Sequence, residues 1–203
     1  MDEIPGCGAG GWTLVMKVDG TKNTFNYPSS YWTNREAYKI DDGLEGLTKK
    51  EAKLASYWNT PFNKICLGMN VKGVKGSTKW IVINHKASSL FDVIADETYK
   101  ETNITRAKWK SLIAASQLYN HCSKEGFNIY EPASSPRKIR LRIGLVTSSD
   151  LKCELVERFN SCIGFGAFIN GCLGKEKKIA CGNLLACRIS QTNTPAFGYI
   201  LVQ

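Results

Sequence analysis

The segment Gly10-Gly11-Trp12-Thr13-Leu14-Val15-Met16 decides which fold we expect for this chain. Two glycines permit a tight turn, because a residue without a Cβ atom tolerates backbone conformations that other residues avoid. Apolar residues then alternate in the manner of a β-strand. On its own, this pattern is typical of a glycine-rich entry to a hairpin in a secreted β-rich protein.

Composition indicates a secreted globular domain. A chain of 203 residues with 43% hydrophobic residues can bury one substantial core, so we expect a single domain over residues 1–203. Its eight cysteines, an even number at irregular spacing, favour up to four disulfides in an oxidising compartment. Structural zinc is the alternative, but it needs close ligand pairs and the chain has no Cys-x-x-Cys. No apolar run reaches the ~20 residues that span a membrane, so we expect no membrane insertion.

Several local patterns predict secondary structure. Strands are expected at Thr13–Val18, at Ile65–Val71 paired with Lys79–Asn84, and at Lys138–Val146. Helices are expected at 49–57, where Thr48 and Glu51 form a capping box, at Ser88–Ala95 and at Thr105–Tyr119.

The strand at Lys138–Val146 also supplies a candidate ligand site. A period of two places Ile139, Leu141 and Ile143 on one face, and Lys138, Arg140 and Arg142 on the other. Together with Arg137, these cations suit the sulfate or carboxylate groups of an anionic polysaccharide, which arginine can bind in a bidentate manner. The alternative is an ordinary solvated face.

The net charge of +9 would also attract nucleic acid, but the cysteine content places the chain outside the cell, so we expect no nucleic-acid partner. We also expect no enzymatic activity. The two histidines, His85 and His121, belong to no recognisable catalytic motif, and the chain has no phosphate-binding loop and no nucleophile elbow.

Both ends of the chain resemble a known family. The GGWT segment at Gly10–Thr13, the run Ser161–Phe168 followed by Cys181-Gly182-Asn183, and the apolar end Gly198–Val202 are similar to fibrinogen-related domains, notably the intelectin type. The closest resemblance is to divergent members found in invertebrate extracellular proteins. It implies an α+β, fibrinogen C-terminal-like fold, with a twisted, mostly antiparallel sheet, short flanking helices and disulfides.

The resemblance has further structural consequences. It implies that Trp12 packs in the core and that Cys153 and Cys162 close a short disulfide loop, as intelectin-type members do. It also implies that this sequence is a fragment that lacks the N-terminal strand and the signal peptide of the full protein.

Ligand and metal residues follow from the same comparison. Asp150, Glu154 and Glu157 are candidate ligands for Ca²⁺, the one cofactor that we expect, and the alternative is a solvated acidic face. Asn160 and Asn183 are candidate ligand-binding residues. Asn160 and Ser161 replace the family's His-His pair, which argues against a calcium-bridged sugar site of the intelectin kind.

We therefore expect a secreted, extracellular, non-enzymatic recognition module that binds carbohydrate or glycoconjugates in adhesion or innate recognition. Its partners would be glycans or glycoproteins, including anionic polysaccharides, or further copies in a homo-oligomer. The alternative is a structural extracellular-matrix protein that contacts other proteins and has no sugar pocket. Asn103-Ile104-Thr105 is an N-glycosylation sequence and predicts a glycan on Asn103.

Overall fold

The computed structural model describes residues 1–71, 73–74, 78–130, 138–149, 153, 159–172, 175–185 and 193–203. The strands are β1 (Glu3–Ile4), β2 (Gly8–Ala9), β3 (Thr13–Asp19), β4 (Ala52–Lys53), β5 (Phe62–Val71), β6 (Lys79–Ala87), β7 (Ser123–Tyr130), β8 (Lys138–Thr147), β9 (Ser161–Cys172), β10 (Lys175–Leu185) and β11 (Asn193–Val202). The helices are short: α1 (Ile40–Leu44), α2 (Ser56–Asn59), α3 (Leu90–Ile94), α4 (Arg106–Lys110) and the 3-10 turn η1 (Ser30–Trp32).

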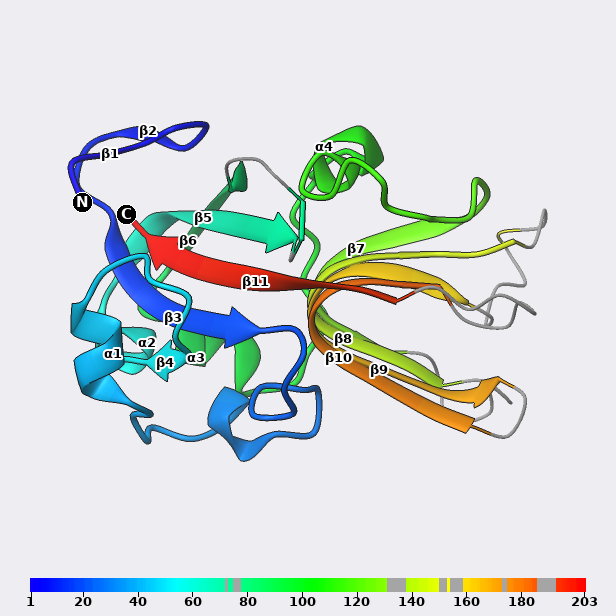
Figure 1. The fold of residues 1–203 in the computed structure, drawn as a ribbon, viewed down its shortest axis with the longest axis horizontal. Helices are drawn as coiled ribbons and strands as arrows, with labels where there is room; N and C mark the ends of the chain where they lie inside the picture. Colours follow the sequence, from blue (N-terminus) through cyan, green and yellow to red (C-terminus); the bar gives the residue numbers. More distant parts are fainter. Residues whose placement is uncertain are drawn as a thin grey trace.

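The last strand, β11, connects the two parts of the main sheet (Figure 1). Its residues from Phe197 to Val202 lie between β3 and β5, antiparallel to both, and β6 pairs with β5 on the far side. Its first residues, Asn193 to Pro195, pair with β10, which continues into β9, β8 and β7. The expected mostly antiparallel sheet with short helices is confirmed.

The part of the sheet around β11 is covered on both faces. Side chains alternate along each strand, so Ile65 and Ile200 belong to one apolar cluster, while Cys66 and Tyr199 belong to another on the opposite face. The first cluster packs against α2, α3 and α4, which supply Tyr57, Val93 and Trp109 among others. The second cluster lies under the N-terminal segment.

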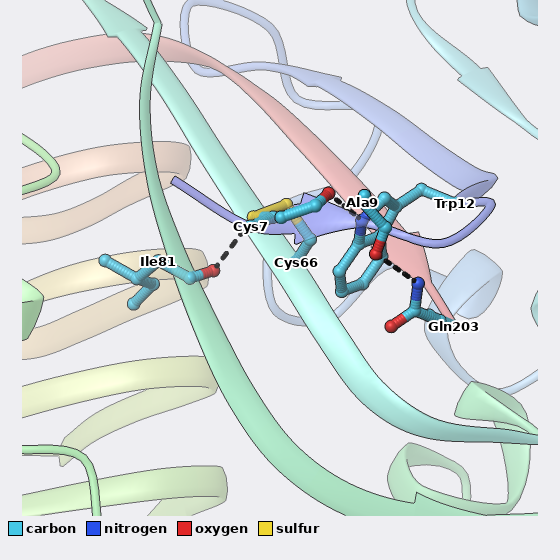
Figure 2. Close-up of a disulfide and its surroundings, with 7 residues drawn as sticks. Cys7, Ala9, Trp12, Cys66, Ile81 and Gln203 are labelled. Atoms are coloured by element: carbon cyan, nitrogen blue, oxygen red, sulfur yellow. Dashed lines mark hydrogen bonds between the residues drawn. A yellow bond between two sulfur atoms is a disulfide. The ribbon is translucent and has the colours of Figure 1, made fainter. Parts of the chain in front are cut away.

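A disulfide fastens this N-terminal segment to the sheet (Figure 2). Cys7 is bonded to Cys66 of β5, and the side-chain amide of Gln203 donates a hydrogen bond of 3.1 Å to the carbonyl of Ala9. Trp12 is only 2% exposed, and its indole N–H donates to the carbonyl of Gly8 at 2.9 Å. The implied place of Trp12 in the core is confirmed.

Four glycines lie side by side across β7 to β10. Gly126 pairs with Gly144, Gly144 with Gly164, and Gly164 with Gly182. Their φ angles are 131°, 155°, 154° and 139°, a region that L side chains rarely adopt. A Cβ atom on any of them would overlap a backbone carbonyl oxygen of a neighbouring segment. The four strands can therefore bend at one common line, which we call the glycine row.

The sheet folds over at the glycine row, and Figure 1 shows β7 to β10 turning sharply where they converge. Residues on both sides of the row meet in one buried cluster, which explains how Leu141 and Val146 of β8 come to share it. The same holds for Cys162 and Ala167 of β9. The two arms of the folded sheet thus enclose a second core between them.

Two of the helix predictions are confirmed only in part. The capping box does not form, because Thr48 accepts a hydrogen bond from the buried Lys17 ammonium and Glu51 accepts from the Asp19 amide and the Thr24 hydroxyl. Residues 52–53 form β4 instead, and only α2 is helical in this region. The third expected helix begins after its N-cap, Thr105, but ends at Lys110. The predicted short helix at Ser88–Ala95 is confirmed as α3.

The predicted Cys153–Cys162 disulfide is wrong. Cys153 is bonded to Cys122, whose segment precedes β7, and Cys162 is a buried free thiol in the core between the two sheet arms. Cys162 lies on β9 between β8 and β10, and its side chain packs in an apolar cluster with Ala167 and Leu184. Cys181 is also free and buried, while the side chain of Cys172 and all of Cys187 lie outside the described part of the chain.

A first prediction tests the glycine row. Gly164→Ala should lower the free energy of unfolding by about 3 kcal/mol or more, because its Cβ would overlap the carbonyl oxygen of Ile143. Gly46→Ala is the matched control: its φ is +74°, but nothing lies within 4 Å of the added atom, so only the backbone cost of about 1–2 kcal/mol remains. Urea unfolding of both variants measures the difference, and equal losses would show that the strands do not need the close approach.

A second prediction tests the cysteines. Burial raises the pKa of the Cys162 thiol to about 12 and raises that of Cys181 well above its usual value, so few thiolates exist at pH 8. Iodoacetamide at pH 8 should label both residues only after denaturation. Digestion of the unreduced protein should yield a Cys122–Cys153 peptide, and recovery of Cys153 linked to Cys162 would contradict this structure.

Candidate functional site

Four side chains form a row across the outer face of one sheet arm. Tyr130 of β7 pairs with Arg140 of β8, Arg140 pairs with Phe168 of β9, and Phe168 pairs with Lys178 of β10. Directly paired residues project from the same face, so aromatic and cationic side chains alternate across four strands. We call these four residues the outer row. Their apolar neighbours, such as Ile139 and Ile179, point to the enclosed core on the other face.

The outer row is accessible. Tyr130 is 50% exposed, Arg140 and Lys178 are exposed, and Phe168 is partly buried. The Lys178 ammonium lies 5.7 Å from the centre of the Phe168 ring, and an ion pair of 3.4 Å joins it to Glu176. Because strands are about 4.8 Å apart, Arg140 and Lys178 are separated by about 10 Å, with the Phe168 ring between them.

Arg142 does not belong to this surface, which corrects the expected cationic ladder on β8. Its side chain is 3% exposed and forms an ion pair of 2.9 Å with Glu97. Its Nε and Nη2 atoms both donate to the carbonyl of Tyr27 at 3.1 Å, and its guanidinium lies 4.1 Å from the centre of the Tyr27 ring. Of these two arginines, only Arg140 is exposed to solvent, and Arg142 is buried.

A glycine makes room for Arg142. Gly166 has a φ of +62°, and a Cβ atom there would come within 2.7 Å of Arg142 Cγ and 3.1 Å of the Trp32 ring. The loop that carries Tyr27 and Trp32 closes over the guanidinium, and Trp32 is itself fully buried. Strand alternation alone could not reveal this, because the covering loop is more than a hundred residues away in the sequence.

Burial also affects Tyr27. Desolvation raises the pKa of its hydroxyl, and the neighbouring positive charge of Arg142 partly opposes that rise. The Arg140 guanidinium lies 5.7 Å from the centre of the same ring, so Tyr27 separates the buried arginine from the exposed one.

The remaining predicted ligand residues are either buried or outside the described residues. Asn183 is 1% exposed, and its amide exchanges hydrogen bonds with the backbone of Gln117 and donates to the carbonyl of Cys162. Asn160 is 2% exposed and donates to Ser149. These asparagines hold β9, β10 and their adjoining segments together and do not face solvent.

The predicted calcium ligands, Asp150, Glu154 and Glu157, lie outside the described residues, as does Arg137. Lys138 opens β8, but its side chain is not described. Within the described part of the chain, no three His, Cys, Asp or Glu side chains group closely enough to hold a metal ion. Calcium therefore stays a prediction.

Asn103 is exposed, as its proposed glycosylation requires. It has a left-handed backbone conformation with a φ of 58°, and its backbone N–H donates to the Glu125 carboxylate at 2.7 Å. The glycan itself stays a prediction.

Comparisons with protein-family models, with curated proteins and with solved structures gave no match. The function must therefore be argued from the residues of this chain.

A third prediction separates the two arginines of β8. Arg142→Gln should lower the free energy of unfolding by about 2–4 kcal/mol, because it removes a charged donor pair and a cation–π contact from a buried place. Arg140→Gln should change it by less than about 0.5 kcal/mol, as is usual at an exposed site. Thermal and urea unfolding test both, and equal effects would show that Arg142 is solvated.

Proposed function

We propose that this chain is a secreted, non-enzymatic recognition module that binds carbohydrate, and that anionic polysaccharides bind along the outer row. Arg140 and Lys178 bind sulfate or carboxylate groups, and the aromatic rings of Phe168 and Tyr130 pack against the apolar faces of sugar rings. The resemblance of both chain ends to fibrinogen-related domains supports the same proposal.

The observation that carries this proposal is the alternation of two exposed cations with two accessible aromatic rings across four paired strands. Guanidinium groups bind oxyanions through paired N–H donors, and the ammonium of lysine adds a point charge. The net charge of +9 adds a long-range attraction for polyanions.

Two disulfides support an oxidising, extracellular environment for this module. In the described residues, no helix is long and apolar enough to cross a membrane.

A fourth prediction tests the outer row. The double variant Arg140→Gln/Lys178→Gln should elute from a heparin column at clearly lower salt than the parent, because such contacts are electrostatic and are screened over about 8 Å at physiological ionic strength. Lys79→Gln/Lys86→Gln is the matched control, since it removes two exposed cations of β6 and the same net charge.

The control should elute close to the parent. If both double variants shift equally, retention depends on net charge and the outer row is not the binding site. If the parent is not retained at all, a structural role without polysaccharide binding becomes the better explanation.

A further inference from the structure

A second surface lies where β3 and β5 end on either side of β11, as Figure 1 shows. Phe197 of β11 pairs directly with Asp19 of β3 and with Asn70 of β5. The three side chains therefore share one face of the sheet, with the aromatic ring in the middle and a polar group on each side. Because neighbouring strands are about 4.8 Å apart, the two polar groups are separated by about 10 Å.

A pocket of about 330 Å³ opens over these residues. Its apolar lining comes from Phe197, Pro195 and Ala196, and its polar lining comes from Asp19, Thr21, Lys49 and Asn70. We call it the strand-end pocket. Its volume lies at the lower end of the range found for small-ligand sites.

Hydrogen bonds hold the polar walls in place. Asp19 Oδ1 accepts from the backbone amide and the hydroxyl of Thr21, at 2.9 and 2.7 Å. Lys49 Nζ donates to Asn70 Oδ1 at 2.6 Å. Asp19 Oδ2 also forms an ion pair of 3.9 Å with Lys22. A carboxylate accepts about four hydrogen bonds and an ammonium donates three, so the Asp19 carboxylate and the Lys49 ammonium can each bond to a ligand as well.

The turn after β3 is also fixed. The amide of Gly20 donates to the carbonyl of Ala196 at 2.9 Å, and a Cβ atom at Gly20 would overlap the backbone of β10 and β11. Asp19 ends β3, and Thr21 lies in the turn that the Gly20 contacts hold against the sheet, so a ligand need not order a free loop when it binds.

We propose that the strand-end pocket binds a neutral pyranose ring, such as the terminal residue of a glycan. One apolar face of the sugar packs on Pro195 and on the accessible part of Phe197, which is 7% exposed. Its hydroxyl groups bond to Asp19 on one side and to Lys49 on the other. One carboxylate and one ammonium leave the pocket without a net charge, which disfavours a strongly anionic or cationic ligand. This inference rests on the proposed carbohydrate-binding function but uses a surface separate from the outer row.

The test uses neutral methyl glycosides of glucose, mannose, galactose and N-acetylglucosamine, titrated into ¹⁵N-labelled protein and followed by NMR. At least one should shift the backbone amides of Asp19, Thr21, Asn70 and Phe197, with a dissociation constant on the order of 1 mM, as expected for a single sugar. Lys49→Met should weaken that binding about tenfold, the loss expected for one charge-assisted hydrogen bond.

Lys50→Met is the matched control, because Lys50 is the next residue, carries the same charge and pairs with Glu45 and Asp42 outside the pocket. It should leave the glycoside affinity unchanged. Three results would each overturn the inference. None of the four glycosides causes shifts at a concentration 50 times the expected dissociation constant of about 1 mM, or the shifts are confined to the outer row, or both lysine variants weaken binding equally.

Heparin retention of the outer-row variant Arg140→Gln/Lys178→Gln distinguishes this inference from the proposed function. If the glycosides fail to bind while the outer-row variants still lose heparin retention, the pocket proposal alone is wrong. If heparin and the glycosides both fail with the folded parent protein, carbohydrate binding as a whole is wrong.

Discussion

The close approach of backbones at the glycine row is the constraint on which the rest of the structure depends. Gly144 and Gly164 lie so near the neighbouring strands that any side chain would overlap a carbonyl oxygen. Because the row crosses β7 to β10 in register, these strands bend together, and the sheet encloses apolar residues from both of its arms. One apolar face is thereby buried without a covering layer of helices, which explains why so few and such short helices suffice.

The bend of β7 to β10 at the glycine row also affects the position of β11 in the sheet. Gly182 pairs with Pro195, so the glycine row ends at the first part of β11, and the remainder of that strand continues between β3 and β5. One strand therefore joins the folded arm to the core around Trp12. Pro195 has no amide N–H to donate to the ladder, which suits a position where pairing passes from one neighbour to another.

Sequence reasoning predicted the features that depend on local pattern. The strands at Thr13–Val18, Ile65–Val71, Lys79–Asn84 and Lys138–Val146, and the helix near Ser88, follow from alternation or from capping, and all are present. It failed where a distant segment competes for the same group. Thr48 and Glu51 bond to tertiary partners in place of a helix end, and Cys153 bonds to Cys122.

The candidate site shows the same division. Arg140 was predicted to lie on the face opposite Ile139 and Leu141, and it is exposed there. Its neighbours Phe168 and Lys178 can be identified only from the register of β9 and β10. Sequence alternation describes one strand at a time, whereas the outer row runs across strands. The four glycines carry the same kind of information, since their positions look unrelated in the sequence and align only in the sheet.

The two arginines of β8 differ in role: Arg142 is buried and structural, and Arg140 lies at the surface. Arg142 is neutralised by Glu97 and covered by Tyr27, so it stabilises the loop and adds little field outside. Lys178 is paired with Glu176 at the surface, where such a pair contributes little and exchanges readily with other anions. Arg140 has a planar group suited to two oxygens of one anion, and it lies between two aromatic rings of the row. In the proposed binding mode, the Arg140 guanidinium and the Lys178 ammonium both bind the anionic groups of the ligand. The Lys178 ammonium then exchanges Glu176 for the ligand at small cost.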